Sequence, residues 1–376
     1  MQFGLSESQH ILKDTARKFF AGECPIATAR KLMDTDTAYD AALWSKLAEQ
    51  GFTGITVPEE YGGMGLGTVE LILLMEEAGY ALLPGPLFST IALAAPLIDA
   101  LGTAAQKRKY LGGIAAGQAR STVALVESDG SWDPSHLELS VTGDHLTGTK
   151  LFVTDAAVAS FIVVAAQNGV FVVEKNAPGM SIEPMKGMDL TRKIYSVGLR
   201  STPAEKLGGP GELGRALDIG TAALAAEMTG GMQRVLETTV AYAKTRKQFG
   251  KPIGIFQAVQ HLCADMYLET ESSRSAAYYA SWALQENAPD AAKAVSIAKM
   301  YASDAGRTVG NRGIQVHGGM GFTWENDLHL YYRRAKASET MLGDATFHRE
   351  RIAKLVIDAA IDVNARDKER TALAVK

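Results

Sequence analysis

The sequence contains little of what marks several large classes of protein. Its 376 residues include two cysteines, Cys24 and Cys263, which give neither a disulfide framework nor the spacing of zinc ligands. Both are expected to be core thiols. Basic residues are not in surplus, because 38 lysines and arginines face 42 acidic residues and the net charge is -4. That balance argues against a nucleic-acid-binding protein.

Long apolar runs are absent as well. The longest, residues 156–166, is far shorter than the ~20 residues that span a bilayer. The N-terminus is too polar and acidic for a signal peptide. With 47% hydrophobic and 21% charged residues, the composition is that of a soluble globular protein. We expect a cytoplasmic protein without membrane contact or a metal site.

Residues 1–118 carry a helical pattern. It begins at Ser6, whose capping-box partner is Gln9, and apolar residues then recur at helical spacing. The passage 57–67 interrupts it with four glycines within six residues, which regular structure does not tolerate. The first third is therefore predicted to be a helical domain.

Residues 119–210 change to short β-type runs that are separated by Gly, Asn, Asp and Pro turns. The runs cover residues 122–126, 137–141, 145–153, 161–165, 170–174 and 194–199. Residues 211–376 are helical again, with a break at Ala288-Pro289. The sequence thus predicts an α+β multidomain protein that is mainly α. It has an N-terminal helical domain, a middle β-domain and a C-terminal four-helix bundle.

Two passages in the last region draw attention. Arg246 lies at the end of a predicted helix, and Gly250 and Pro252 close that helix, so this passage alone predicts a helix–helix corner with a basic end. The glycine-rich passage 315–323 could let backbone N–H groups approach a phosphate, although alone it is equally a plain loop. Its spacing is not that of a dinucleotide-binding fingerprint.

Taken together, four passages in order resemble the acyl-CoA dehydrogenase family over essentially the whole chain. They are residues 57–67, 148–154, 246–257 and 315–323. The resemblance implies the fold described above, FAD as cofactor, and oxidation of an acyl-CoA thioester to the trans-2-enoyl form. It also implies a tetramer and an electron-transfer flavoprotein as electron acceptor.

The resemblance assigns FAD contacts residue by residue. Arg246 and Phe249 would hold the FAD of a neighbouring subunit, with the guanidinium on the pyrophosphate. The remaining contacts on that side would be Gln257, Gln315, Gly318 and Gly319. Phe152 would pack beside the flavin and the Thr154 hydroxyl would bond its N5, although an ordinary alternating strand explains both residues too.

One segment departs from the family pattern. Val126 stands where the family has a hydroxyl residue, whereas Ser131 would remain as a substrate contact. The larger departure concerns the general base. Leu342 occupies the position of the usual catalytic glutamate, and Gly220, 26 residues before Arg246, occupies the alternative position of the base. Neither residue can accept a proton.

Three carboxylates near these positions in sequence are candidates for a displaced base, and each has an alternative explanation. For Asp344 the alternative is the N-cap of the final helix from Ala345. For Glu339 it is a position facing solvent, and for Glu227 it is an ion pair with Arg234 along the same helix.

Three hypotheses follow. The chain could be an acyl-CoA dehydrogenase that is active alone through a displaced carboxylate. It could be the flavin-binding partner subunit in a heterotetramer, as in bacterial heteromeric members that act on bulky thioesters such as steroid side chains. A flavin monooxygenase or nitroalkane-type oxidase of the same fold is a third hypothesis.

Overall fold

The computed structural model describes residues 4–209 and 213–358. The N-terminal region is helical, as predicted, and the capping box of Ser6 and Gln9 is formed. Its helices are α1 (Glu7–Glu23), α2 (Ile26–Met33), α3 (Ala41–Glu49), α4 (Thr68–Tyr80), the π-helical segment η3 (Phe88–Ala94), α5 (Ala95–Leu101) and α6 (Ala104–Ala115). The glycine passage forms a folded loop in which a Cβ on Gly63 would lie 2.1 Å from the Val57 carbonyl oxygen. Only glycine fits there.

The middle region contains two four-stranded sheets that enclose a small core of their own. One sheet has the order β1-β4-β5-β8 and the other β2-β3-β7-β6. Only the β1–β4 pair is parallel among these neighbours. The strands are β1 (Ser121–Ala124), β2 (Ser140–Thr142), β3 (His145–Thr154), β4 (Phe161–Ala166), β5 (Gly169–Glu174), β6 (Met180–Met185), β7 (Ile194–Pro203) and β8 (Glu205–Gly208).

The sequence prediction of this β-domain was incomplete. It missed β6 and β8, and it placed the strand before the 143 turn at 137–141, whereas β2 begins at Ser140. Both missed strands lie at the edge of a sheet and are largely exposed. A half-exposed edge strand carries few of the apolar residues on which strand prediction depends.

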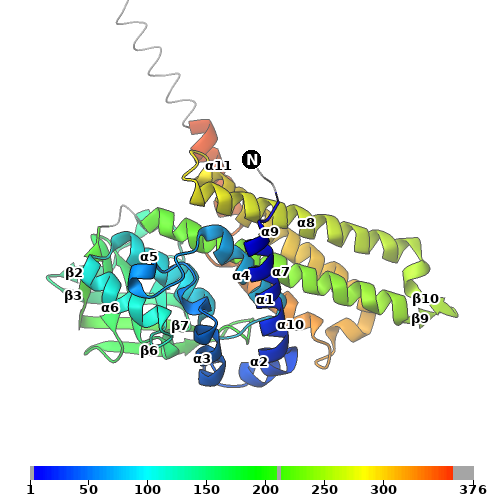
Figure 1. Ribbon diagram of the computed structural model, residues 1–376, viewed down its shortest axis with the longest axis horizontal. Helices are drawn as coiled ribbons and strands as arrows, with labels where there is room; N and C mark the ends of the chain where they lie inside the picture. Colours follow the sequence, from blue (N-terminus) through cyan, green and yellow to red (C-terminus); the bar gives the residue numbers. More distant parts are fainter. Residues whose placement is uncertain (1–3, 210–212, 359–376) are drawn as a thin grey trace, which may run out of the picture.

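The C-terminal region is a bundle in which α7 (Leu213–Thr245), α8 (Gln257–Gln285) and α9 (Ala291–His317) run side by side (Figure 1). Helices α10 (Leu328–Thr340) and α11 (Ala345–Ala353) pack on α9, and the π-helical η9 (Lys354–Asp358) follows. A short hairpin, β9 (Lys247–Gln248) and β10 (Lys251–Pro252), joins α7 to α8. Part of the predicted glycine loop is helical, because α9 continues to His317 and η8 (Gly318–Phe322) follows.

The N-terminal and C-terminal helices share one core. Helix α4 lies so close to α7 that a Cβ on Gly230 would sit 1.8 Å from the Glu76 carbonyl oxygen. A continuous apolar cluster, which includes Cys24, extends from α1 and α4 into α7, α8 and α9. Cys263 is half-buried instead of lying in the core. In Figure 1 the β-sheets lie at one end of the long axis and the β9–β10 hairpin lies at the other.

Candidate active site

Two residues at the end of β3, Phe152 and Thr154, are called the strand-end group here. A register irregularity between Lys150 and Val153 gives Phe152 a φ of 55° and turns its ring outward, with 43% of the residue exposed. Thr154 is buried. The bulge therefore presents an aromatic face at the surface of the β-domain, next to a buried hydroxyl.

Lys150 fixes this strand against the segment that departs from the family pattern. Its ammonium is fully buried and donates to the Leu125 carbonyl oxygen at 2.9 Å and to Glu127 Oε1 at 2.5 Å. Burial lowers the pKa of Lys150, and the Glu127 carboxylate opposes that shift. The Leu151 N–H also donates to the Val126 carbonyl at 2.8 Å. Sequence reasoning gave Lys150 no role, although it lies within the recognised passage 148–154.

The second set of predicted FAD residues, called the corner group, consists of Arg246, Phe249, Gln257, Gln315, Gly318 and Gly319. All six are exposed, and Phe249, with a φ of 52°, is 89% exposed. Within the described residues the Arg246 guanidinium has no hydrogen-bond or ion-pair partner. A Cβ on Gly318 or Gly319 would meet nothing within 4 Å. The corner group is an open surface with one uncommitted cation.

A stacked pair of rings holds the corner group together. The rings of Tyr242 on α7 and His317 on α9 lie 4.1 Å apart between centroids, which brings the turn η8 beside the end of α7. The Arg246 carbonyl accepts the Ile253 N–H at 2.8 Å and closes the hairpin. The structure thus places these six residues around the adjoining ends of α7, α8 and α9, whereas the strand-end group lies where β3 meets η3 and the loop before β7.

The position of the missing base borders a cavity of about 370 Å³. Its walls come from residues 131–136 of the β-domain, the first turns of α7, and α11. Ser131 and Leu342 both line it. Across its wall, Arg351 donates to both carboxylate oxygens of Asp218, at 2.5 and 2.8 Å. Burial raises the pKa of Asp218, and the guanidinium opposes that rise.

Residues 341–344 are called the base turn here. Residues 341–343 are buried, and hydrogen bonds reach the turn from two sides. Leu342 is 6% exposed with a φ of 59°, which a leucine rarely adopts. On one side Lys299 donates to the Gly343 carbonyl at 2.8 Å and to the Glu339 carbonyl at 3.0 Å. On the other side His348 Nε2 donates to the Leu342 carbonyl at 3.0 Å. The turn is therefore rigid although its apex carries no base.

Neither of these supporting groups is free to abstract a proton at Leu342, because the fully buried Lys299 donates to two carbonyls and His348 donates to the Leu342 carbonyl itself. Burial lowers the pKa of His348 to about 3 and that of Lys299 to about 7. A histidine so resistant to protonation is a weak base. Sequence reasoning missed both Lys299 and His348. The only local signal was that Lys299 lies among the apolar positions of the helix that became α9.

The three candidate carboxylates all have partners in the structure. Asp344 accepts the Phe347 N–H at 2.8 Å as the N-cap of α11, which confirms the capping alternative. Glu339 does not simply face solvent, because it accepts from Lys336 at 2.6 Å and Arg307 at 3.0 Å.

Glu227 is buried and does not pair with Arg234, so that expectation was wrong. It accepts from Arg192 at 2.6 and 2.8 Å and from Arg334 at 2.7 Å. These arginines come from the β-domain and from α10, which is why the local sequence around α7 could not identify them.

The alternative base position is closed. A Cβ on Gly220 would lie 2.4 Å from Leu93 Cδ2 and 3.0 Å from the Ala92 carbonyl oxygen. Helix α7 therefore contacts η3 directly at this point, and the backbone spacing leaves no room for a carboxylate side chain.

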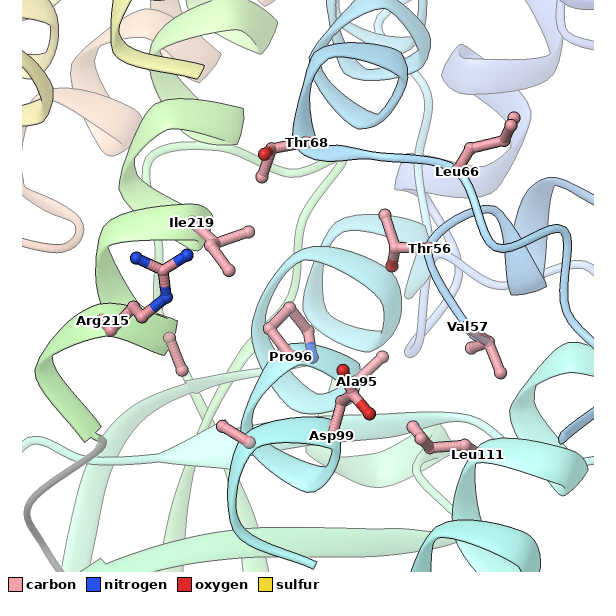
Figure 2. Close-up of a pocket in the computed structure, with 12 residues that line it drawn as sticks. Thr56, Val57, Leu66, Thr68, Ala95, Pro96, Asp99, Leu111, Arg215 and Ile219 are labelled. Atoms are coloured by element: carbon pink, nitrogen blue, oxygen red, sulfur yellow. The ribbon is translucent and has the colours of Figure 1, made fainter. Parts of the chain in front are cut away.

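A separate cavity of about 380 Å³ lies between the N-terminal helices and α7. Figure 2 shows its walls, with Thr56 just before the glycine passage, Leu66 within it, Asp99 from α5, and Arg215 from α7. Its charged groups have partners, since Arg215 donates to the Leu284 carbonyl at 3.0 Å and Lys107 lies 3.1 Å from Asp99. None of the residues predicted from the sequence lines it.

Other classes of site are not seen in the parts of the chain that the structure describes. Residues 4–209 and 213–358 include no cluster of three or more His, Cys, Asp or Glu side chains that could hold a metal ion. No helix within these ranges is long and apolar enough to cross a membrane.

The fold is that of an acyl-CoA dehydrogenase. The family model for the acyl-CoA dehydrogenase N-terminal domain matches residues 6–118, and the model for the C-terminal domain matches residues 212–357. The chain belongs to the acyl-CoA dehydrogenase family, flavoprotein oxidoreductases that act on CH–CH bonds. It is 35% identical to the acyl-CoA dehydrogenase IpdE2 of Mycobacterium tuberculosis, over 89% of this chain and 93% of that one.

Solved structures agree with this assignment. A variant of the steroid acyl-CoA dehydrogenase Tcur3481-Tcur3483 has a TM-score of 0.88 and 35% identity over 94% of this chain and 99% of that one. The ChsE4-ChsE5 complex of Mycobacterium tuberculosis has a TM-score of 0.87 and 28% identity over 94% and 98%. An FAD complex of PigA has a TM-score of 0.86 and 25% identity over 95% and 99%.

Proposed function

We propose that this chain takes part in FAD-dependent α,β-dehydrogenation of an acyl-CoA thioester as one subunit of a heterotetramer. A second acyl-CoA dehydrogenase subunit would carry the catalytic base. The observation that supports this most directly is the base turn, where a buried leucine replaces the glutamate and the nearest carboxylates cap a helix or form ion pairs.

The corner group fits FAD. An uncommitted guanidinium suits a pyrophosphate, and glycines without side-chain neighbours let backbone N–H groups approach the adenosine half. The family resemblance assigns Arg246 and Phe249 to the FAD of a neighbouring subunit, and both residues are exposed, so a second chain can reach them. We infer that this chain lends Arg246 and Phe249 to the flavin of its partner.

When bound, FAD accepts the hydride from the substrate β-carbon. The contributions of this chain are then positional. Arg246 would neutralise the pyrophosphate, Phe249 would cover the cofactor, and Gln257 and Gln315 would hydrogen-bond it from the ends of α8 and α9. The α-proton would go to a base on the partner, since the base turn of this chain holds none.

The substrate proposed is a bulky acyl-CoA, of which a steroid side chain is one example. Support comes from two structural relatives, the steroid acyl-CoA dehydrogenase Tcur3481-Tcur3483 and the ChsE4-ChsE5 complex. An electron-transfer flavoprotein is the proposed acceptor, and the cytoplasm is the proposed compartment. The alternative, an active homotetramer that uses Asp344, predicts a different outcome in the experiment below.

The experiment is co-expression with a base-bearing acyl-CoA dehydrogenase subunit, followed by purification through a tag on this chain. We expect a mixed tetramer with a flavin spectrum, and its flavin should be bleached anaerobically by a steroid-side-chain CoA thioester. This chain alone should not be bleached by a panel of linear, branched and polycyclic thioesters. A stable homotetramer that is bleached would contradict the proposal, and so would rapid reoxidation by air with a hydroxylated product.

A gain-of-function variant sharpens this test. Leu342→Glu places a carboxylate on a turn that Lys299 and His348 already hold. If only the base is missing, the variant alone should gain slow flavin bleaching, whereas Leu342→Gln, its uncharged match, should not. Equal bleaching by both variants would show that this turn does not govern proton abstraction.

A further inference from the structure

Asp155, the residue after Thr154, is a buried carboxyl with one oxygen unaccounted for. It is 1% exposed and has a φ of 57°. Its N–H donates to the Lys193 carbonyl at 2.9 Å, and its Oδ2 accepts from Ser89 Oγ at 2.8 Å. Its Oδ1 has no hydrogen-bond partner among the described residues. A buried carboxylate oxygen without a donor is costly and calls for an explanation.

Charged groups surround Asp155 without contacting it. The residues that act on it electrostatically are Arg192 from the loop before β7, Tyr195 from β7, Glu227 from α7 and Arg334 from α10. Both arginines are already committed, Arg192 to Glu227, and Arg334 to Glu227 and Asp189. Burial accordingly outweighs the attraction of the arginines and raises the pKa of Asp155 to about 6.

The position of Asp155 connects two parts of the site. Through its backbone it ends β3 immediately after Thr154, and through its side chain it bonds η3. The same π-helical segment contributes Ala92 and Leu93, which close the alternative base position at Gly220. π-Helical segments are uncommon and are often found at functional sites.

We propose that Asp155 is a proton-binding positioning residue. Proton uptake by its carboxyl secures the end of β3, and with it Thr154, against the N-terminal helices. Ionisation leaves a buried charge with one hydrogen bond and loosens that strand end. The proton binding itself needs no cofactor, whereas its consequence at Thr154 rests on the flavin-binding function proposed above.

The sign of the pH effect follows from linkage. Because the folded chain binds this proton more readily than the unfolded chain, stability from this group is complete near pH 4 and is lost as pH rises to about 6. Asp155→Asn keeps the acceptor for Ser89 and the left-handed backbone but cannot ionise. Its melting temperature should therefore exceed that of the wild type at pH 7.5 by roughly 2–4 °C, with a smaller excess at pH 5.

Hydrogen exchange locates the effect. In the wild-type chain the peptide 150–158 should be better protected at pH 5 than at pH 7.5, after correction for intrinsic exchange. Asp155→Asn should show no such difference, whereas Asp14→Asn, an exposed control on α1, should behave as the wild type. Equal pH dependence in the wild type and in Asp155→Asn would overturn the inference.

Ser89→Ala provides a second, opposite test. It removes the donor that favours the ionised carboxyl, so the transition in melting temperature should move to higher pH. A transition that stays in place would count against Asp155 as the titrating group.

A flavin measurement separates the two proposals. The FAD dissociation constant of the wild-type assembly should rise from pH 5 to pH 7.5 by more than that of the assembly with Asp155→Asn. If FAD binds but its dissociation constant depends on pH identically in both assemblies, the proposed effect of Asp155 on Thr154 is overturned. Failure to bind FAD at either pH would instead reject the proposed function, and the melting and exchange results would still decide whether Asp155 binds the proton.

Discussion

The corner group and the base turn are built in opposite ways. The corner group is exposed, and its arginine has no partner within the described residues, whereas the base turn is buried and tied by Lys299 and His348. An exposed, uncommitted cation is of use to a ligand or to another chain. A buried turn with a leucine at its apex keeps its shape, and its one carboxylate, Asp344, caps α11. The comparison indicates a chain that supports chemistry at a neighbouring site.

The largest effect should come from the buried ion pairs of Glu227, which join α7 to the β-domain and to α10. Glu227→Gln removes the shared partner of Arg192 and Arg334 in a buried cluster, and breaking such a pair costs about 3–5 kcal/mol. Chemical denaturation of the purified chain would measure the loss. Glu339→Gln is the matched control, since Arg307, one of its partners, is 46% exposed and the expected loss is below about 1 kcal/mol.

If Glu227 were instead a base, activity and stability would respond differently to its substitution. Glu227→Gln would then remove activity while leaving stability nearly unchanged. A loss of stability below about 1 kcal/mol would therefore contradict the structural role given to this residue.

The second largest effect tests the exposed corner group. Arg246→Gln in a mixed assembly should weaken FAD binding by about 10- to 100-fold, because hydrogen bonds to charged groups contribute about 1.5–3 kcal/mol. The folding of this chain should be unchanged, since the guanidinium is exposed. Fluorescence titration with FAD measures the change. Lys244→Gln, two residues earlier near the end of α7 and also exposed, should bind FAD as the wild type does.

The two regions also differ in how far the sequence could predict them. Three residues of the corner group lie within 242–257 and the other three within 315–319, so helix-ending residues and family motifs were enough to find them. The helical and β regions were found by the same local periodicities. The missed strands β6 and β8 are exposed edges whose residues reflect solvent rather than a core.

The supports of the base turn could not be predicted, because they depend on contacts between distant residues. Lys299 reaches Gly343 across 44 positions in the chain, and Glu227 meets Arg334 across 107. A buried charge is recognisable only when its partner is known, and single-sequence patterns carry no information about such pairs. For the same reason, Glu227 was expected to pair along its own helix.

The third prediction concerns the rigidity of the base turn. Lys299→Met keeps the length of the side chain but removes the hydrogen bonds to the Glu339 and Gly343 carbonyls, at a cost of about 1–3 kcal/mol. Since burial lowers the pKa of Lys299 to about 7, the wild type should gain stability as pH rises from about 7 towards 10. Melting curves between pH 6 and 9.5 should show this gain in the wild type and not in Lys299→Met. The same gain in both chains would mean that Lys299 is not the group that titrates.

The smallest effect decides whether the turn hides a displaced base. Asp344 caps α11, so Asp344→Ala should cost about 1 kcal/mol, whereas Asp344→Asn keeps an acceptor for the Phe347 N–H and should cost less. The bleaching rate of the mixed assembly should be the same with either variant, because the proposed base lies on the partner. Stopped-flow measurement of flavin reduction provides the rate, and thermal melting provides the stability. If Asp344→Asn abolished flavin reduction while the melting temperature stayed unchanged, Asp344 would be the base. The base turn would then be catalytic, and its contrast with the corner group would fail.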